Sequence, residues 1–129
     1  MIKTLLKYSL LFAISWTLII FILCCTPGRF IPTNNWLELL SFDKFVHASI
    51  FFVLTSLWLI YGLHSGKLTN SIIVLIISAN IAYGGLLEIM QATVFSQRSG
   101  DWFDFIANSF GCLMGFWFFK KKKSLFILN

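Results

Sequence analysis

Four long apolar stretches follow one another along the chain, separated by short segments rich in polar and turn-forming residues. They cover about Leu5–Cys25, Phe45–Tyr61, Ile72–Gln91 and Trp102–Phe119. A helix of roughly 20 residues, rising 1.5 Å per residue, crosses a hydrocarbon layer about 30 Å thick. Lipid offers backbone groups no hydrogen-bond partner, so such stretches must be helical. The pattern predicts an all-α membrane protein, a bundle of about four transmembrane helices that forms a single domain over residues 1–129.

Composition supports this prediction. The chain is 58% hydrophobic and 12% charged, with a mean hydropathy of +0.85, which is too little charge to cover a soluble domain. Lys3 and Lys7 give the chain a basic start like that of a signal peptide. However, the stretch is long and no A-x-A cleavage site follows it, so we expect it to be retained as a span. The three cysteines show no CxxC pair and no zinc spacing. We therefore expect no cofactor and assign no metal ligand.

The lysines and arginines predict the orientation of the bundle. One side would carry Lys3, Lys7, Lys67 and Lys120–Lys123, and the other Arg29, Lys44 and Arg98. Because cytoplasmic segments are enriched in Lys and Arg, the lysine-rich side should be cytoplasmic. Both termini then lie in the cytoplasm, as expected for a multi-pass protein of the plasma membrane. No basic stripe suited to nucleic acid is present.

The remaining polar residues gather at the predicted outer ends of three spans. They are Asp43, Lys44 and His47, then Glu88 and Gln91, then Arg98, Asp101, Asp104 and Asn108. Asp43 and His47 share a helix face at i, i+4, and Glu88 and Gln91 lie one turn apart. An unpaired intramembrane charge costs roughly 2.5–3.5 kcal/mol. We therefore expect a network, with Arg98 as a fork across two carboxylates.

Small residues continue the same helix faces away from these charges. Gly84 precedes Glu88 by one turn, and Gly111 and Gly115 continue the stripe of Asp104 and Asn108. A G-x-x-x-G pair lets a neighbouring helix approach closely. The sequence thus predicts a tight helix contact that opens outward into a polar pocket.

These residues form three ordered motifs that resemble the VanZ-like family. The motifs are Asp43-Lys44-x-x-His47, then Tyr83-Gly84-x-x-x-Glu88-x-x-Gln91, then Arg98-x-x-Asp101-x-x-Asp104-x-x-x-Asn108-x-x-Gly111-x-x-x-Gly115. The resemblance covers about residues 26–118. It implies a small polytopic bacterial membrane protein, in a family whose founding member is associated with teicoplanin resistance. One departure is that Phe51 and Phe52 stand where the family often has a tyrosine.

Three functions remain open. The leading hypothesis is a cell-envelope protein that binds a lipid-linked or amphiphilic ligand, such as a membrane lipid, an envelope precursor or a lipoglycopeptide. In this hypothesis Arg98 and Lys44 hold an anionic head. The second is an enzyme acting on an envelope lipid. It would use His47 and Glu88 as base and acid, or place them with Asp101 and Asp104 around a divalent cation, although no reaction can be assigned. The third is a structural subunit or stabiliser that associates, or oligomerises, through Gly111 and Gly115.

Overall fold

The computed structural model describes residues 2–26, 42–94 and 100–127. Within these ranges all regular structure is helical: α1 (Ile2–Lys7), α2 (Ser9–Cys25), α4 (Phe42–His64), α5 (Asn70–Thr93) and α6 (Trp102–Ile127). The all-α prediction is confirmed. Two helices, over Asp43–His64 and Asn70–Thr93, are long and apolar enough to cross a membrane, and α2 is a shorter apolar helix.

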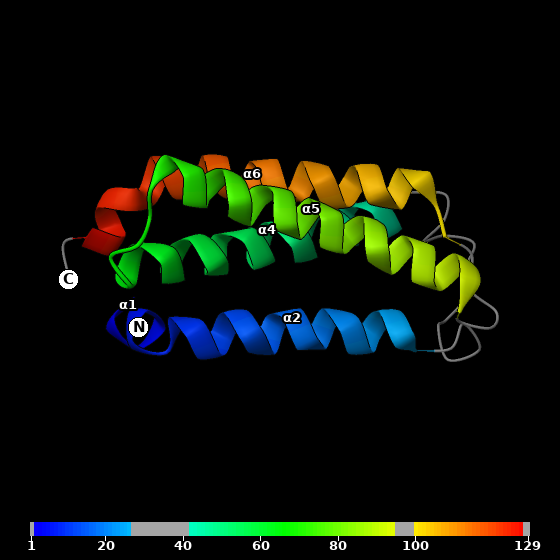
Figure 1. The fold of residues 1–129 in the computed structure, drawn as a ribbon, viewed down its shortest axis with the longest axis horizontal. Coiled ribbons are helices and arrows are strands. Elements are labelled where there is room, and N and C mark those ends of the chain that lie inside the picture. The colour runs from blue at the N-terminus through cyan, green and yellow to red at the C-terminus, as the bar shows by residue number, and fades with distance from the viewer. Residues whose placement is uncertain (1, 27–41, 95–99, 128–129) are drawn as a thin grey trace.

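The long helices lie side by side and alternate in direction along the chain (Figure 1). Helix α1, the turn between α4 and α5 and the last turns of α6 lie at one end of the bundle. The first turns of α4 and α6 lie at the opposite end, where α5 finishes, so α4 and α6 run parallel to each other. This arrangement brings Asp43 and Lys44 of α4, Glu88 of α5 and Asp104 of α6 to a common end, whereas Lys120–Lys123 of α6 lie toward the opposite end.

Several helix bounds differ from the predicted spans. The first apolar stretch is interrupted at Tyr8, which separates α1 from α2, and α4 extends beyond 45–61 at both ends. Helix α6 continues through the lysine run to Ile127. Lysine ends an apolar stretch but is a good helix former, so it gives the helix no reason to stop. The extension also makes contacts of its own, since the Phe126 ring stacks on Phe119 with a centroid distance of 6.3 Å. The sequence Trp36-Leu37-Glu38-Leu39-Leu40 predicts one amphipathic turn at the membrane interface, but these residues lie outside the described ranges.

Helix α4 is the centre of the bundle, and its most extensive contact is with α6. A Cβ atom added at Gly111 would overlap the backbone of Ala48, and one at Gly115 would lie 2.6 Å from the Phe52 carbonyl oxygen. The close helix approach predicted for this glycine pair is therefore made within the chain, against α4. The face considered for a partner or a second copy is occupied by α4 in this structure.

Side-chain hydrogen bonds join the other helices deep in the bundle. Trp16 of α2 donates through Nε1 to the Ile50 carbonyl of α4 at 3.0 Å. The Tyr83 hydroxyl of α5 donates to the Thr17 carbonyl at 2.9 Å. Asn80 donates through Nδ2 to the Thr55 hydroxyl at 3.1 Å. Such interhelical bonds contribute about 0.6 kcal/mol each on average in an apolar bundle, so they orient the helices more than they hold them together.

Candidate functional site

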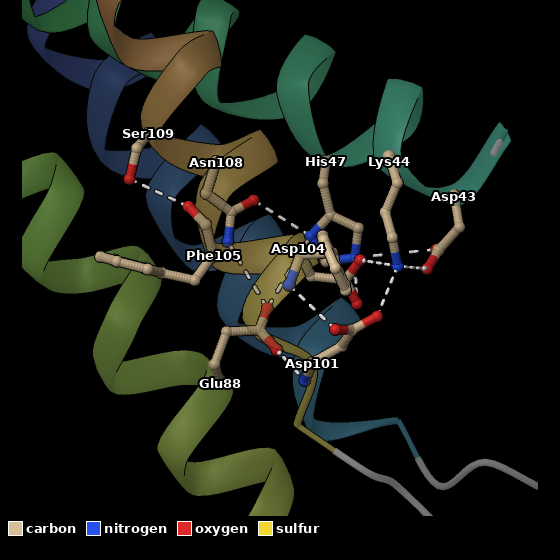
Figure 2. Close-up of polar contacts among 10 residues, drawn as sticks. Asp43, Lys44, His47, Glu88, Asp101, Asp104, Phe105, Asn108 and Ser109 are labelled. Carbon is tan, nitrogen blue, oxygen red and sulfur yellow. Dashed lines mark hydrogen bonds and ion pairs between the residues drawn. The ribbon is translucent and has the colours of Figure 1, made fainter.

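The structure assembles a polar cluster at the end of the bundle where α4 and α6 begin (Figure 2). Seven of the nine residues predicted for the functional cluster take part: Asp43, Lys44, His47, Glu88, Asp101, Asp104 and Asn108. They come from three helices, because alternation of the chain brings the start of α4, the end of α5 and the start of α6 together. These seven residues form the polar cluster.

Lys44 joins α4 to the beginning of α6. Its ammonium nitrogen lies 2.6 Å from Asp101 Oδ2 and 2.5 Å from Asp104 Oδ1. These are charge-assisted hydrogen bonds, which are shorter and stronger than neutral ones. The sequence predicted a cation placed across two carboxylates but assigned that role to Arg98, which lies outside the described residues. Among the described residues, Lys44 makes this contact.

Asp101 fixes the start of α6. Its Oδ1 accepts a hydrogen bond from the Phe103 amide at 2.9 Å, the arrangement of a helix N-cap. Its own backbone amide donates to Glu88 Oε2 at 3.2 Å and so ties α6 to α5. The hydrogen bond from Lys44, followed by that from the Phe103 amide, holds the pKa of the Asp101 carboxyl below its ordinary value.

A line of hydrogen bonds runs across all three helices from His47 to Glu88. His47 Nδ1 lies 3.0 Å from Asn108 Oδ1, and Asn108 Nδ2 donates to Glu88 Oε1 at 3.5 Å. Asn108 is only 1% exposed and Glu88 8%, so their polar atoms depend on these partners. Because the amide presents its oxygen to the imidazole, we assign the ring proton to Nδ1.

The other ring nitrogen of His47, Nε2, faces two carboxylates. Nε2 lies 3.7 Å from Asp43 Oδ1 and 3.8 Å from Asp104 Oδ2. Both separations exceed the usual hydrogen-bond range. The imidazole is thus held by Asn108 on one side, whereas its Nε2 atom on the other side is too far from either carboxylate for a hydrogen bond.

Of the two remaining residues predicted for the site, the structure describes Gln91 alone. Gln91 is buried, at 4% exposure. Its side chain forms no hydrogen bond with any residue that the structure describes. Arg98 belongs to residues 95–99, outside the described ranges.

A cavity of about 330 Å³ lies between α5 and α6, beside the polar cluster. Its lining is largely apolar and comprises Gly85, Glu88, Ile89, Ala92, Gly100, Asp101, Trp102 and Phe105. Sequence reasoning expected a pocket above the glycine contact and did not select Gly85, Ile89, Ala92 or Phe105. The available signal was the spacing of Gly85, Ile89 and Ala92 at i, i+4 and i+7, which places two small residues on one face of α5.

The chain matches no protein-family model, no curated protein and no solved structure. The resemblance to the VanZ-like family therefore rests on the sequence motifs alone. What the site can do follows from its own geometry: it joins an apolar cavity to a set of hydrogen-bond acceptors held at fixed positions.

Proposed function

We propose that this chain is a VanZ-like protein of the bacterial plasma membrane that binds an amphiphilic ligand at the outer leaflet. In this proposal it crosses the membrane four times, with both termini in the cytoplasm. Support comes from the apolar length of α4 and α5 and from the outward-facing side chains of the other two long helices. Leu18 and Ile22 of α2 are 55% and 63% exposed, and Phe110 of α6 is 57% exposed. Such surfaces suit a lipid solvent and would be unfavourable in water.

The observation that carries the proposal is the cavity between α5 and α6. Its lining is apolar at Gly85, Ile89 and Ala92 and also includes the carboxyl residues Glu88 and Asp101. An amphiphile has the same division, with an acyl or prenyl chain at one end and a polar head at the other. The volume of about 330 Å³ lies within the range of small-molecule sites, roughly 300–1,000 Å³.

The polar cluster indicates which kind of head would fit. Glu88 and Asp101 present carboxylate oxygens, which accept hydrogen bonds. Lys44, considered from the sequence as a holder of an anionic head, is already bonded to Asp101 and Asp104. The described residues therefore favour a head that donates hydrogen bonds, through hydroxyl or amine groups, over a bare anion. A lipid or lipid-linked molecule with a sugar or amino head has this chemistry.

Lipid co-purification tests the proposal with a matched pair of variants on α5. Ala92 lines the cavity, whereas Ala79 is also exposed on α5 but is not part of the lining. We expect the detergent-extracted wild type to retain a defined lipid, detected by mass spectrometry. Ala92→Leu, which adds volume inside the cavity, should reduce its occupancy several-fold, and Ala79→Leu should not.

Two outcomes would contradict the proposal. One is a wild-type protein that retains no lipid above the level of a detergent-exchanged control. The other is equal lipid retention by Ala92→Leu and Ala79→Leu.

A further inference from the structure

Three side chains of the polar cluster direct metal-binding atoms toward one point. Asp43 and His47 come from the first turns of α4, and Asp104 from the first turn of α6. One ligand atom from each residue lies within 4.8 Å of the others. Asp43 and His47 are one helical turn apart, so α4 presents both on the same side (Figure 2).

The orientation of His47 is the second observation. Its Nδ1 is bound to Asn108, which leaves Nε2 aimed between Asp43 and Asp104 at 3.7 and 3.8 Å. An imidazole nitrogen that faces two carboxylates calls for a positive charge between them, either a proton on Nε2 or a bound cation. In metal sites a ligating histidine almost always donates its other ring N–H to a carbonyl, carboxylate or water. Asn108 is the equivalent acceptor here, and Glu88 in turn fixes the Asn108 amide.

The charge of the polar cluster is the third observation. It contains four carboxylates, Asp43, Glu88, Asp101 and Asp104, against the single ammonium of Lys44. When His47 is neutral, the three aspartates alone exceed the charge of Lys44 by two, and when His47 is protonated they exceed the two positive charges by one. Lys44 engages Oδ1 of Asp104, so the Oδ2 atom on the His47 side is a separate position. A divalent cation at that position would offset most of the excess.

We propose that Asp43 Oδ1, His47 Nε2 and Asp104 Oδ2 bind a divalent transition-metal ion, with Asn108 and Glu88 orienting the imidazole. One imidazole nitrogen and two carboxylate oxygens suit Mn²⁺ or Zn²⁺. Ca²⁺ and Mg²⁺ prefer all-oxygen sites. The Asp43 side chain is 60% exposed, which leaves it room to rotate inward and complete the site. The proposal does not rest on the ligand-binding function above.

The test uses the full chain, purified in detergent without a polyhistidine tag and stripped with a chelator. Equilibrium dialysis against MnCl₂ and ZnCl₂, followed by elemental analysis, measures affinity and stoichiometry. We expect one ion per chain. His47→Ala and Asp43→Asn should each weaken binding by at least about 10-fold, and Asn108→Ala by about 10- to 100-fold through loss of the imidazole orientation.

His64→Ala is the matched control, since His64 is the other histidine of the chain and ends α4 at the opposite end of the bundle. It should bind metal as the wild type does. Asp43→Asn keeps the test decisive if a more buried variant fails to fold, because Asp43 is the most exposed of the three ligands. The proposal is overturned if stripped wild type shows no saturable binding of either ion. It is also overturned if His47→Ala binds as tightly as His64→Ala.

Discussion

Helices α4 and α6 meet in two neighbouring regions that are held together in different ways. At the polar end, Lys44 and His47 contact Asp104 and Asn108 through charge and hydrogen bonds. Further along, the backbone of α6 at Gly111 and Gly115 comes close to the backbone of α4 at Ala48 and Phe52. The stability of the first region depends on each charged or polar group keeping its partner. The stability of the second depends on glycine having no side chain. Removing atoms should therefore damage one region, and adding atoms should damage the other.

The largest effect is expected from adding one methyl group in the glycine region. The new Cβ in Gly111→Ala would overlap the Ala48 carbonyl, which is backbone and cannot move aside as a rotamer. Overpacking of this kind costs about 1–3 kcal/mol or more, and here we expect the upper end, in a denaturant titration of the detergent-solubilised protein.

Gly62→Ala is the control for that measurement. Its Cβ would meet Leu68 Cδ1 at 2.8 Å, the flexible end of a side chain that can rotate away. Alanine is also the better helix former by about 0.8–1.0 kcal/mol. The variant should therefore lie within about 1 kcal/mol of wild type. Equal destabilisation by Gly111→Ala and Gly62→Ala would show that the α4–α6 backbone contact is no tighter than the contact of Gly62 with Leu68.

An intermediate effect is expected from removing the cation in the polar region. Lys44→Met leaves the buried Asp104 carboxylate without its ammonium partner. An unsatisfied buried group costs about 1–3 kcal/mol, and solvent at the 34% exposed lysine side chain should keep the loss toward the lower end. The free energy of unfolding of Lys44→Met, compared with that of the wild type, measures this loss.

Two further variants test this prediction. Lys67→Met, in the exposed turn between α4 and α5, should change stability by less than about 0.5 kcal/mol. The double variant Lys44→Met/Asp104→Asn should recover part of the loss, because the unpaired charge is then gone. Strict additivity of the two substitutions would mean that the pair is not coupled.

The smallest effect concerns Asp101 and pH. Its pKa in the folded protein is lowered from the ordinary 3.8. A lowered pKa stabilises the folded state at pH values above 3.8, and that contribution disappears as the pH falls through the folded-state value. The stability difference between wild type and Asp101→Asn should thus be constant above about pH 5 and shrink toward pH 2. A difference that grows on acidification would contradict the Lys44–Asp101 assignment.

Much of the polar cluster was predictable because it follows from two regular features. Helical spacing places Asp43 with His47, and reversal of the chain between helices brings the start of α4, the end of α5 and the start of α6 to one end. Neither feature requires knowledge of the packing. The prediction that these groups form a network is in accord with the contacts of Lys44 and His47.

The rest depends on how each helix is rotated about its axis. The apolar stretches are hydrophobic nearly all round, so their sequences do not reveal which face meets which neighbour. That is why the cavity at Gly85 and Ala92, the partner of the Gly111–Gly115 pair and the convergence of Asp43 with Asp104 were not predicted. The continuation of α6 past Phe119 was missed for another reason, because the end of an apolar stretch is not the end of a helix.

The paired glycines also set the register of α6 along α4. Gly111 faces Ala48 and Gly115 faces Phe52, one turn further along in both parallel helices. Sliding α6 by a single turn, about 5.4 Å, would bring either Ala107 or Phe119 to one of these two contact points, and both carry a Cβ. These two close contacts therefore fix the position of α6 along α4, and that position places Asp104 and Asn108 beside Lys44 and His47.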